Sequence, residues 1–255
     1  MDKKQPIIQL LKVNKRFGNF RVLEDMDLEV HEGETLAIIG RSGVGKSTIL
    51  RLMAGLIRPD SGEVFVEGLE IDMLNEQQLN ELRKKMGVVF QSAALFDSLN
   101  VFGNVAFRLL RDFRMPKSQA VEVVKQKLEL VGLNSGLLEL MPSQLSGGMR
   151  KRVGLARAIA SDPEIILYDE PTSGLDPVTS EAINELILDM QKKLGVTSVV
   201  VTHDMHSAYK VANRIAMLYD GRIIGVGTPN QFKNSKDPYI RQFVTGSVEG
   251  PMPIR

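Results

Sequence analysis

The sequence predicts an α/β fold: a mainly parallel sheet core with an antiparallel β part at the N-terminus and an inserted helical subdomain. Short apolar runs rich in β-branched residues, typical of buried strands, alternate with segments of helical periodicity. Such alternation indicates parallel strands joined by right-handed crossovers. The interval from Ser92 to about Ala160 has no good strand pattern, which indicates the insertion. The apolar runs are residues 35–39, 86–90, 165–168 and 198–201.

The N-terminal residues predict a β-hairpin over residues 7–30. Its turn is expected at Gly18-Asn19, after which one strand resumes at 20–23 and another short strand occupies 27–30. The remaining elements outside the insertion are predicted from periodicity and turn residues. They are a helix at 47–55, a strand and turn at 63–71, a polar helix at 76–85, two strands within 214–226 around an Asp220-Gly221 turn, and a helix at 239–245.

Two amphipathic helices are indicated in the second half of the chain. Ser118 is expected to cap the first, and Gly132 to end it. Its apolar positions are spaced three or four residues apart, and they are Val121, Val124, Leu128 and Val131. The second helix lies between the last two apolar runs and carries Ile183, Leu186, Ile187, Met190 and Leu194 on one face.

Length and composition limit the domain organisation. With 255 residues, of which 43% are apolar, the chain is near the upper size for one hydrophobic core. We therefore expect one domain over residues 1–255. Its core takes residues 1–91 and 161–235, the helical subdomain takes 92–160, and a C-terminal helix with an extended tail takes 236–255.

Charge and residue counts exclude several classes of function. The net charge of +1 gives no reason to expect nucleic acid as a partner. The absence of cysteine excludes disulfides and thiolate metal sites, and it agrees with a reducing compartment. Met1–Gln5 are expected to lead into a strand rather than a secretory signal. No apolar run approaches the roughly 20 residues of a membrane helix, so any action at a membrane is expected from its surface or through a partner.

A phosphate-binding motif follows the strand 35–39. The residues are Gly40-Arg41-Ser42-Gly43-Val44-Gly45-Lys46-Ser47-Thr48, which fit the P-loop pattern G-x-x-x-x-G-K-[ST]. Glycines let the backbone N–H groups approach an anion closely, and the helix N-terminus favours negative charge. Lys46 is expected on the β- and γ-phosphates of a nucleotide, Ser47 on Mg²⁺, and Thr48 near the α-phosphate. A chance match in a glycine-rich turn is the alternative, and the strand and helix around the motif argue against it.

Two carboxylates end the strand 165–168. Asp169 suits the shell of a Mg²⁺ ion, directly or through water, and Glu170 suits polarising an attacking water as a general base. Adjacent acids alone would favour a solvated acidic turn. Their place after a buried strand, in a chain with a P-loop, favours the catalytic interpretation.

A second glycine-rich helix start lies at Leu145-Ser146-Gly147-Gly148-Met149. Ser146 is a natural N-cap, and the two glycines permit close approach of an anion to the helix N-terminus. Taken alone, this stretch is equally well explained as an ordinary helix start.

Together these motifs resemble the ATP-binding subunits of ABC transporters. The P-loop, Gln91, Leu-Ser-Gly-Gly, Asp169-Glu170 and His203 occur in that family's order, and the match covers nearly the whole chain. The resemblance implies ATP hydrolysis, with ATP and Mg²⁺ as cofactors. It further implies Gln91 on Mg²⁺ and in sensing the membrane partner, and His203 on the γ-phosphate. Ser146, Gly147 and Gly148 should bind the γ-phosphate held by the opposite protomer of a homodimer, whose seam Ser173–Asp176 should line.

The resemblance also gives Phe17 the place of an aromatic residue that stacks on adenine. The hairpin core is the alternative for Phe17, and a simple strand-end residue is the alternative for His203. His31 and His206 fit no motif and are expected at the surface. Met149 departs from the family's commoner glutamine, which puts a ribose contact there in doubt but not the phosphate contact.

Three stretches are similar to the Mla/Mce-type phospholipid transport ATPases: residues 90–105, 144–152 and 242–253. That similarity implies two integral-membrane permease subunits, an MCE-domain lipid-binding protein and a small regulatory subunit as partners. It also implies a peripheral position on the cytoplasmic face of the inner (plasma) membrane. Another ABC importer, for amino acids or metal ions, is the second interpretation, and a soluble ABC ATPase is the third.

Two surfaces are predicted to contact other chains. The stretch from Gln91 to Phe107 has more apolar residues than a solvated loop needs, and those left exposed are expected to receive a helix of the permease. The tail after residue 245 contains two glycines and two prolines and cannot continue a helix. It is expected either to fray or to lie extended across the neighbouring protomer.

Overall fold

The structure is a computed structural model that describes residues 6–253. The predicted N-terminal segment Met1–Gln5 and the last two residues of the predicted tail lie outside the described residues. The chain divides into two compact units. Unit one comprises residues 1–75 and 197–255, and unit two comprises residues 76–196. The narrower limits expected for the helical subdomain, 92–160, remain a prediction.

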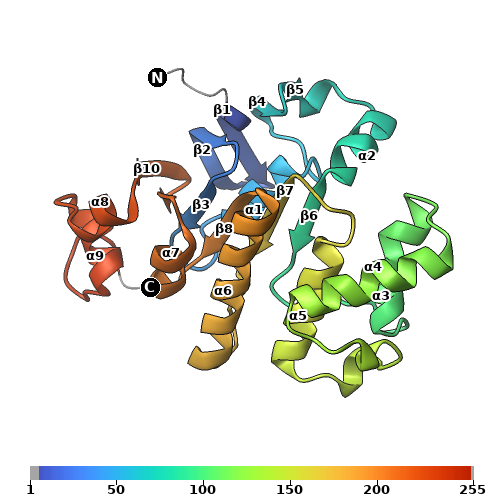
Figure 1. The fold of residues 1–255 in the computed structure, drawn as a ribbon. Helices are drawn as coiled ribbons and strands as arrows, with labels where there is room; N and C mark the ends of the chain where they lie inside the picture. Colours follow the sequence, from blue (N-terminus) through green and yellow to red (C-terminus); the bar gives the residue numbers. More distant parts are fainter. Residues whose placement is uncertain (1–5, 254–255) are drawn as a thin grey trace. The chain divides into compact units, whose positions relative to one another are not determined.

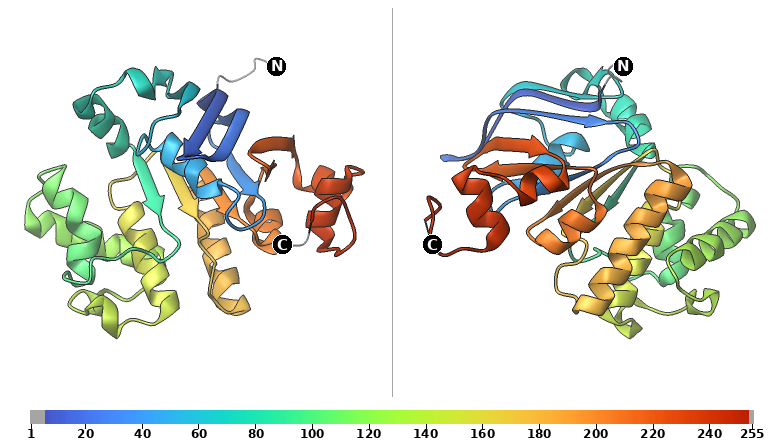
Figure 2. Two further views of the ribbon diagram at one scale, coloured as in Figure 1. Left: turned by 180° about the vertical axis from the view of Figure 1, so that it is seen from behind. Right: turned by 60° about the vertical axis from the view of Figure 1, so that its left-hand side comes forward.

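Unit one contains an antiparallel sheet with the strand order β2-β1-β4-β5. The predicted hairpin and its Gly18-Asn19 turn are confirmed, and Figure 2 shows its two long strands in blue. The two short strands expected after the turn are one continuous strand. A bulge at Asp25, with φ 45°, allows Leu23 and Met26 both to face the core although they are three residues apart. The strands are β1 (Pro6–Phe17), β2 (Phe20–His31), β4 (Ser61–Val66) and β5 (Leu69–Glu70).

A second set of strands in unit one is centred on β3 (Thr35–Ile39), all of whose residues are buried. β3 pairs in parallel with β8 (Thr197–Thr202) and β9 (Arg214–Tyr219), as the apolar runs predict. β10 (Arg222–Gly227) pairs antiparallel with β9 across the predicted Asp220-Gly221 turn. Unit one also holds the helices α1 (Lys46–Met53), η1 (Ile71–Met73), α7 (Met205–Val211), α8 (Pro229–Lys233) and α9 (Pro238–Thr245).

The sequence leaves two alternatives for the tail, fraying or an extended course, and in the structure the tail turns back onto α9. Gly246 ends the helix with φ 65°, and Met252 packs into an apolar cluster with Phe232 and Ile240. The Gln242 side chain donates to the Met252 carbonyl at 3.1 Å and accepts from the Met252 N–H at 2.7 Å. The N–H and the carbonyl of Met252, which stands between two prolines, are thereby satisfied within the same chain.

Unit two contains the parallel pair β6 (Met86–Val89) and β7 (Ile165–Asp169). Residues 92–160, all of which the structure describes, contain no strand, as predicted. α3, α4 and α5 of this interval pack on one another, as the green to yellow helices of Figure 1 show. The helices of unit two are α2 (Glu76–Lys84), α3 (Val101–Arg111), α4 (Lys117–Leu130), η2 (Ser135–Leu137), η3 (Pro142–Gln144), α5 (Gly147–Ala158) and α6 (Pro177–Leu194).

Two helix starts differ from the expectation. α4 begins at Lys117, so Ser118 is not its cap; Pro116 precedes the helix and offers no side-chain hydrogen bond. α3 was not predicted, because Gly103 near its start weakens the helical pattern. Asn100 caps α3 by accepting the Gly103 N–H at 2.8 Å. None of the helices formed within residues 6–253 combines the length and apolar character needed to cross a bilayer.

Candidate functional site

The predicted site residues fall into two groups, one in each unit. Unit one holds Phe17, the P-loop 40–48 and His203. Unit two holds Gln91, Ser146–Gly148 and the pair Asp169-Glu170. Apart from Phe17, which ends a strand of the antiparallel sheet, these residues stand where a strand of the parallel set ends or a helix begins. That is where ligands of α/β proteins bind.

The P-loop connects the buried strand β3 to helix α1 through glycines in the left-handed region. Gly40 has φ 153°, and a Cβ there would lie 2.5 Å from the Leu218 carbonyl oxygen. Gly45 has φ 110° and caps α1, and a Cβ there would lie 2.6 Å from Val22 Cγ1. Only glycine fits such contacts. The loop is therefore built in close contact with β9 and with the N-terminal hairpin.

Lys46 is the first residue of α1 and is only 5% exposed. Its ammonium donates to the carbonyls of Gly40 at 2.8 Å and Arg41 at 3.0 Å, so it spans the loop it belongs to. The first turn of α1 carries no acidic side chain. Positive charge, a helix N-terminus and Ser47 beside it thus converge on one place, which suits phosphate groups.

His203 leaves the same edge of the sheet as the P-loop. Ile39 of β3 pairs with Thr202 of β8 in the parallel register. Gly40 and His203 therefore follow directly after the ends of two neighbouring strands. His203 is exposed. Asp204, which follows it, caps α7 by accepting from the N–H groups of His206 and Ser207. Burial raises the pKa of Asp204, but hydrogen bonds from the Ser207 hydroxyl and from these N–H groups outweigh it and hold the pKa below its usual value.

Phe17 lies at the end of β1, with 48% of its surface exposed. The Lys15 ammonium is 5.6 Å from the centre of its ring. The alternative that Phe17 belongs to the hairpin core is therefore wrong. An exposed aromatic face at the end of this hairpin agrees with the predicted stacking role.

The carboxylates stand at the end of β7 in unit two. Val89 of β6 pairs with Tyr168 of β7 in the parallel register. Gln91 and the pair Asp169-Glu170 therefore lie at the same edge of these two strands. Glu170 is only 7% exposed, which contradicts a solvated acidic turn. Its φ is 48°, an uncommon conformation outside glycine. The Gln91 side chain donates to the Ser173 hydroxyl at 3.2 Å.

Ser146 caps α5, as predicted: its hydroxyl accepts the Met149 N–H at 3.2 Å. Gly147 is exposed, whereas a Cβ at Gly148 would lie 2.8 Å from Thr179 Cγ2 at the start of α6. Glycine at this second position lets the two helix starts approach each other. The contact of this turn with a phosphate stays a prediction.

Lys151 is a site residue that the sequence analysis missed. It lies on α5 and is 8% exposed, and its ammonium donates to the carbonyl of Gln91 and, at 3.4 Å, to that of Glu170. Burial lowers its pKa, although the carboxylates of Glu170 and Asp169 oppose that shift. The available signal was a lysine four residues before Leu155, an apolar position of the same predicted helix.

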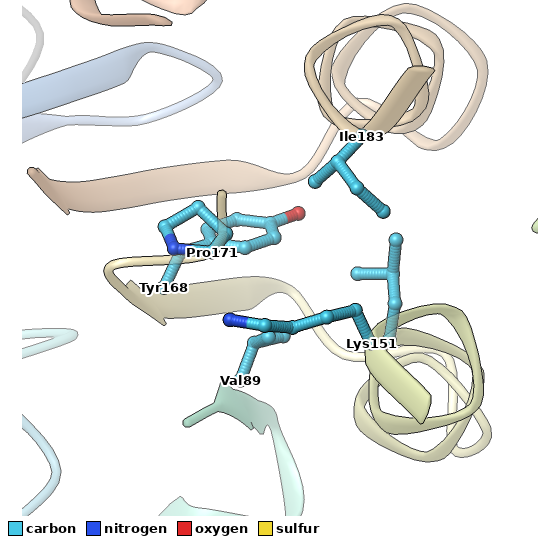
Figure 3. A pocket seen from close by; sticks show the side chains of 6 residues that line it. Val89, Lys151, Tyr168, Pro171 and Ile183 are labelled. Carbon is cyan, nitrogen blue, oxygen red and sulfur yellow. The ribbon is translucent and has the colours of Figure 1, made fainter. Parts of the chain in front are cut away.

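A cavity of about 10 Å³ lies beside the Lys151 side chain. It holds at most one water molecule, so it is not a nucleotide pocket. Figure 3 shows the Lys151 chain running past Val89, with its nitrogen between the strands that carry Val89 and Tyr168. The lining residues are Val89, Lys151, Leu155, Tyr168, Pro171 and Ile183.

Comparison with known proteins identifies the family. The model of the ABC transporter family matches residues 23–173. The chain is 41% identical to MlaF, the ATP-binding protein of an intermembrane phospholipid transport system of Escherichia coli, over 98% of this chain and 92% of MlaF. It is 39% identical to mkl of Mycobacterium leprae, described as a probable ribonucleotide transport ATP-binding protein, over 96% of this chain and 70% of mkl.

A solved structure agrees with this result. An ATP-binding cassette captured as a dimer in a post-hydrolysis state, bound to ADP and Pi, superposes with a TM-score of 0.81 at 34% sequence identity. The match covers 87% of this chain and 98% of that cassette. The predicted fold class is thereby confirmed. The chain belongs to the ABC transporter family, as an ATP-binding subunit with ATPase activity.

Proposed function

We propose that this chain supplies the energy for moving phospholipids between membranes. The observation that carries the proposal is the 41% identity to MlaF over nearly the full length of both chains. The name of mkl, at 39% identity, offers ribonucleotides as a second substrate class. The coverage favours phospholipid, because this chain spans 92% of MlaF but only 70% of mkl.

The P-loop half binds the nucleotide. Backbone N–H groups of residues 40–48 and the ammonium of Lys46 hold the phosphates, and Phe17 stacks on the base. Among the described residues no group of three or more histidines and acids could hold a metal ion by itself. The predicted ligands Ser47, Gln91 and Asp169 are all oxygen donors, which fits Mg²⁺ held jointly with phosphates. Bound Mg²⁺ neutralises part of the phosphate charge.

Hydrolysis depends on Glu170. Its carboxylate accepts the proton of the attacking water, and its low exposure keeps competing solvent away. Gln91 orients that water or the metal from the neighbouring strand end, and His203 donates to the γ-phosphate. Ser146–Gly148 of a second copy closes the site, so that the working unit is a homodimer.

The partners are permease subunits in the membrane and an MCE-domain lipid-binding protein, with a small regulatory subunit. The chain then sits at the cytoplasmic face of the inner membrane. Phe96 is 44% exposed, and its ring lies 4.7 Å from that of Phe107. We expect the exposed part of this pair to contact the permease helix.

The catalytic part is tested with Glu170→Gln, which keeps size and hydrogen bonding but removes basicity. ATP should still bind, while kcat should fall by about 100-fold or more. Lys46→Ala is the matched comparison, because it should lose nucleotide affinity itself. Near-normal hydrolysis by Glu170→Gln would place the base elsewhere.

The transport part is tested on the complex purified from membranes. Mass spectrometry should identify permease and MCE-domain subunits, and solvent extraction should release phospholipid. Vesicle assays then compare ATP-driven transfer of labelled phospholipid with uptake of a labelled ribonucleotide. Transfer of the ribonucleotide alone would overturn the lipid assignment.

A further inference from the structure

One face of α5 holds a strained stretch of backbone in unit two. Lys151, Gly154 and Arg157 are spaced three residues apart on this helix, and all three face the loop that follows β6. Arg157 donates to the carbonyl of Ala94 at 2.7 Å and to that of Ala93 at 2.6 Å. A Cβ at Gly154 would lie 3.1 Å from the Ala93 Cβ. The loop therefore lies directly on the helix.

Three of the four carbonyls that these cations bind belong to left-handed residues. The φ angles are 62° for Ala93, 45° for Ala94 and 48° for Glu170. Such conformations cost free energy outside glycine, and they persist only where the surroundings fix them. The fourth carbonyl, that of Gln91, accepts from Lys151 as well. Lys151 thus joins the ends of β6 and β7, the two strands of unit two that carry predicted catalytic groups.

The burial of Lys151 makes this contact hard to replace. The neighbouring cavity is lined mainly by apolar side chains and has room for one water at most (Figure 3). A buried ammonium is tolerated only where it is hydrogen-bonded. Replacement by an apolar side chain would leave the two carbonyls without this donor, in a place where water cannot fully substitute.

We propose that Lys151 is a positioning residue for ATP hydrolysis. Its ammonium fixes the backbone of Glu170 and Gln91, and so the place of the carboxylate and the amide that act on the attacking water. The inference rests on the proposed roles of these two residues. Because Lys151 binds main-chain carbonyls and lies in the unit without the P-loop, its loss should slow catalysis and spare nucleotide affinity.

The test compares Lys151→Met, Lys151→Gln and Lys151→Arg in the full-length chain. We expect kcat of Lys151→Met to fall about 10-fold to 100-fold, the cost of a small misplacement of catalytic groups. KM for ATP and affinity for a fluorescent ATP analogue should stay within about two-fold. Lys151→Arg, which keeps a cationic donor, should recover most of kcat. Arg152→Met is the matched control, since Arg152 is on the same helix but binds the carbonyl of Gly132.

A local readout separates positioning from simple loss of stability. Amide hydrogen exchange should accelerate in the peptides covering residues 91–94 and 170–173 of Lys151→Met, and remain unchanged at the P-loop. Lys151→Gln retains a polar donor and should give the same pattern with a smaller amplitude. It serves as the readout should the methionine variant fail to fold.

Three outcomes would overturn the inference. One is a kcat for Lys151→Met within two-fold of the parent, while Glu170→Gln is inactive. That result would refute the role of Lys151 and leave the proposed function intact. Another is a parallel fall in kcat, affinity and melting temperature that Lys151→Arg does not restore, which indicates a purely structural lysine. The third is unchanged exchange at residues 91–94. Activity in Glu170→Gln would instead overturn the proposed function.

Discussion

The P-loop and the loop after β6 both place backbone in left-handed conformations, but they achieve it by opposite means. The P-loop uses glycines, at Gly40, Gly43 and Gly45. The loop after β6 has alanines at 93 and 94 instead, and the Arg157 guanidinium of α5 holds both of their carbonyls. In the first region the conformation is available to the residues themselves; in the second it is imposed by a helix more than fifty positions further along the chain.

This difference shows where a loop's shape is encoded. Glycine reaches the left-handed region at little cost, so a glycine-rich loop can take such a conformation without a hydrogen bond that offsets strain. An alanine pays for that shape, and hydrogen bonds from a charged donor must compensate. The P-loop conformation therefore carries little strain of its own, whereas the conformation of the second loop depends on α5. Any movement of α5 relative to this loop would change its conformation.

Gly45→Ala should disrupt the P-loop, and we expect it to have the largest effect of the three substitutions considered. A Cβ there meets Val22 as well as an unfavourable φ, together costing about 3 kcal/mol. ATP affinity should fall about 100-fold in a titration with a fluorescent analogue. Gly33→Ala is the matched control, because it has φ 74° with nothing within 4 Å and should leave affinity unchanged. Unaltered binding by Gly45→Ala would show that the loop adapts.

Arg157→Met should destabilise the loop after β6. Two carbonyls lose a guanidinium donor whose pKa is lowered by burial, so the free energy of unfolding should drop by about 2 kcal/mol. Urea denaturation measures this value. The exposed Arg150, which binds one carbonyl at the start of its own helix, should lose less than about 1 kcal/mol as Arg150→Met. Equal losses in both variants would mean that the loop needs no such support.

Ala94→Gly tests the strain in the loop after β6 directly, and we expect it to have the smallest effect on stability. Glycine relieves about 1 kcal/mol of left-handed strain, but it also gives the unfolded chain up to about 1 kcal/mol of extra freedom. The melting temperature should thus barely change. Ala106→Gly, within helix α3, should lose at least about 1 kcal/mol. A marked stabilisation by Ala94→Gly would show that the α5 cations do not compensate the strain.

What could be predicted from the sequence follows the same division. The strand and helix on either side of the P-loop, the two hairpins and the capping role of Ser146 are encoded within a few consecutive residues, and the structure confirms them. Lys151 and Arg157 act on residues about sixty positions away, and nothing in their own neighbourhood marks that contact. Their roles therefore emerge only from the packing of α5.

Two smaller errors concern strand β2 and the tail. The bulge at Asp25 interrupts the alternation of β2, so one strand was predicted as two. The glycines and prolines of the tail exclude a helix, which leaves fraying or an extended course as the two predictions. That argument is correct, but it does not foresee that Gln242 binds the backbone of Met252 and turns the segment back.

The half-exposed ring of Phe17 offers a place for a fluorescent probe of nucleotide binding. The chain contains no tryptophan, so Phe17→Trp would introduce a single indole at the end of the hairpin that contacts the P-loop. The indole keeps an aromatic face for a base and retains the nearby Lys15 cation. Its emission would then follow the arrival and departure of unlabelled nucleotide in real time, in the chain alone and in its membrane complex.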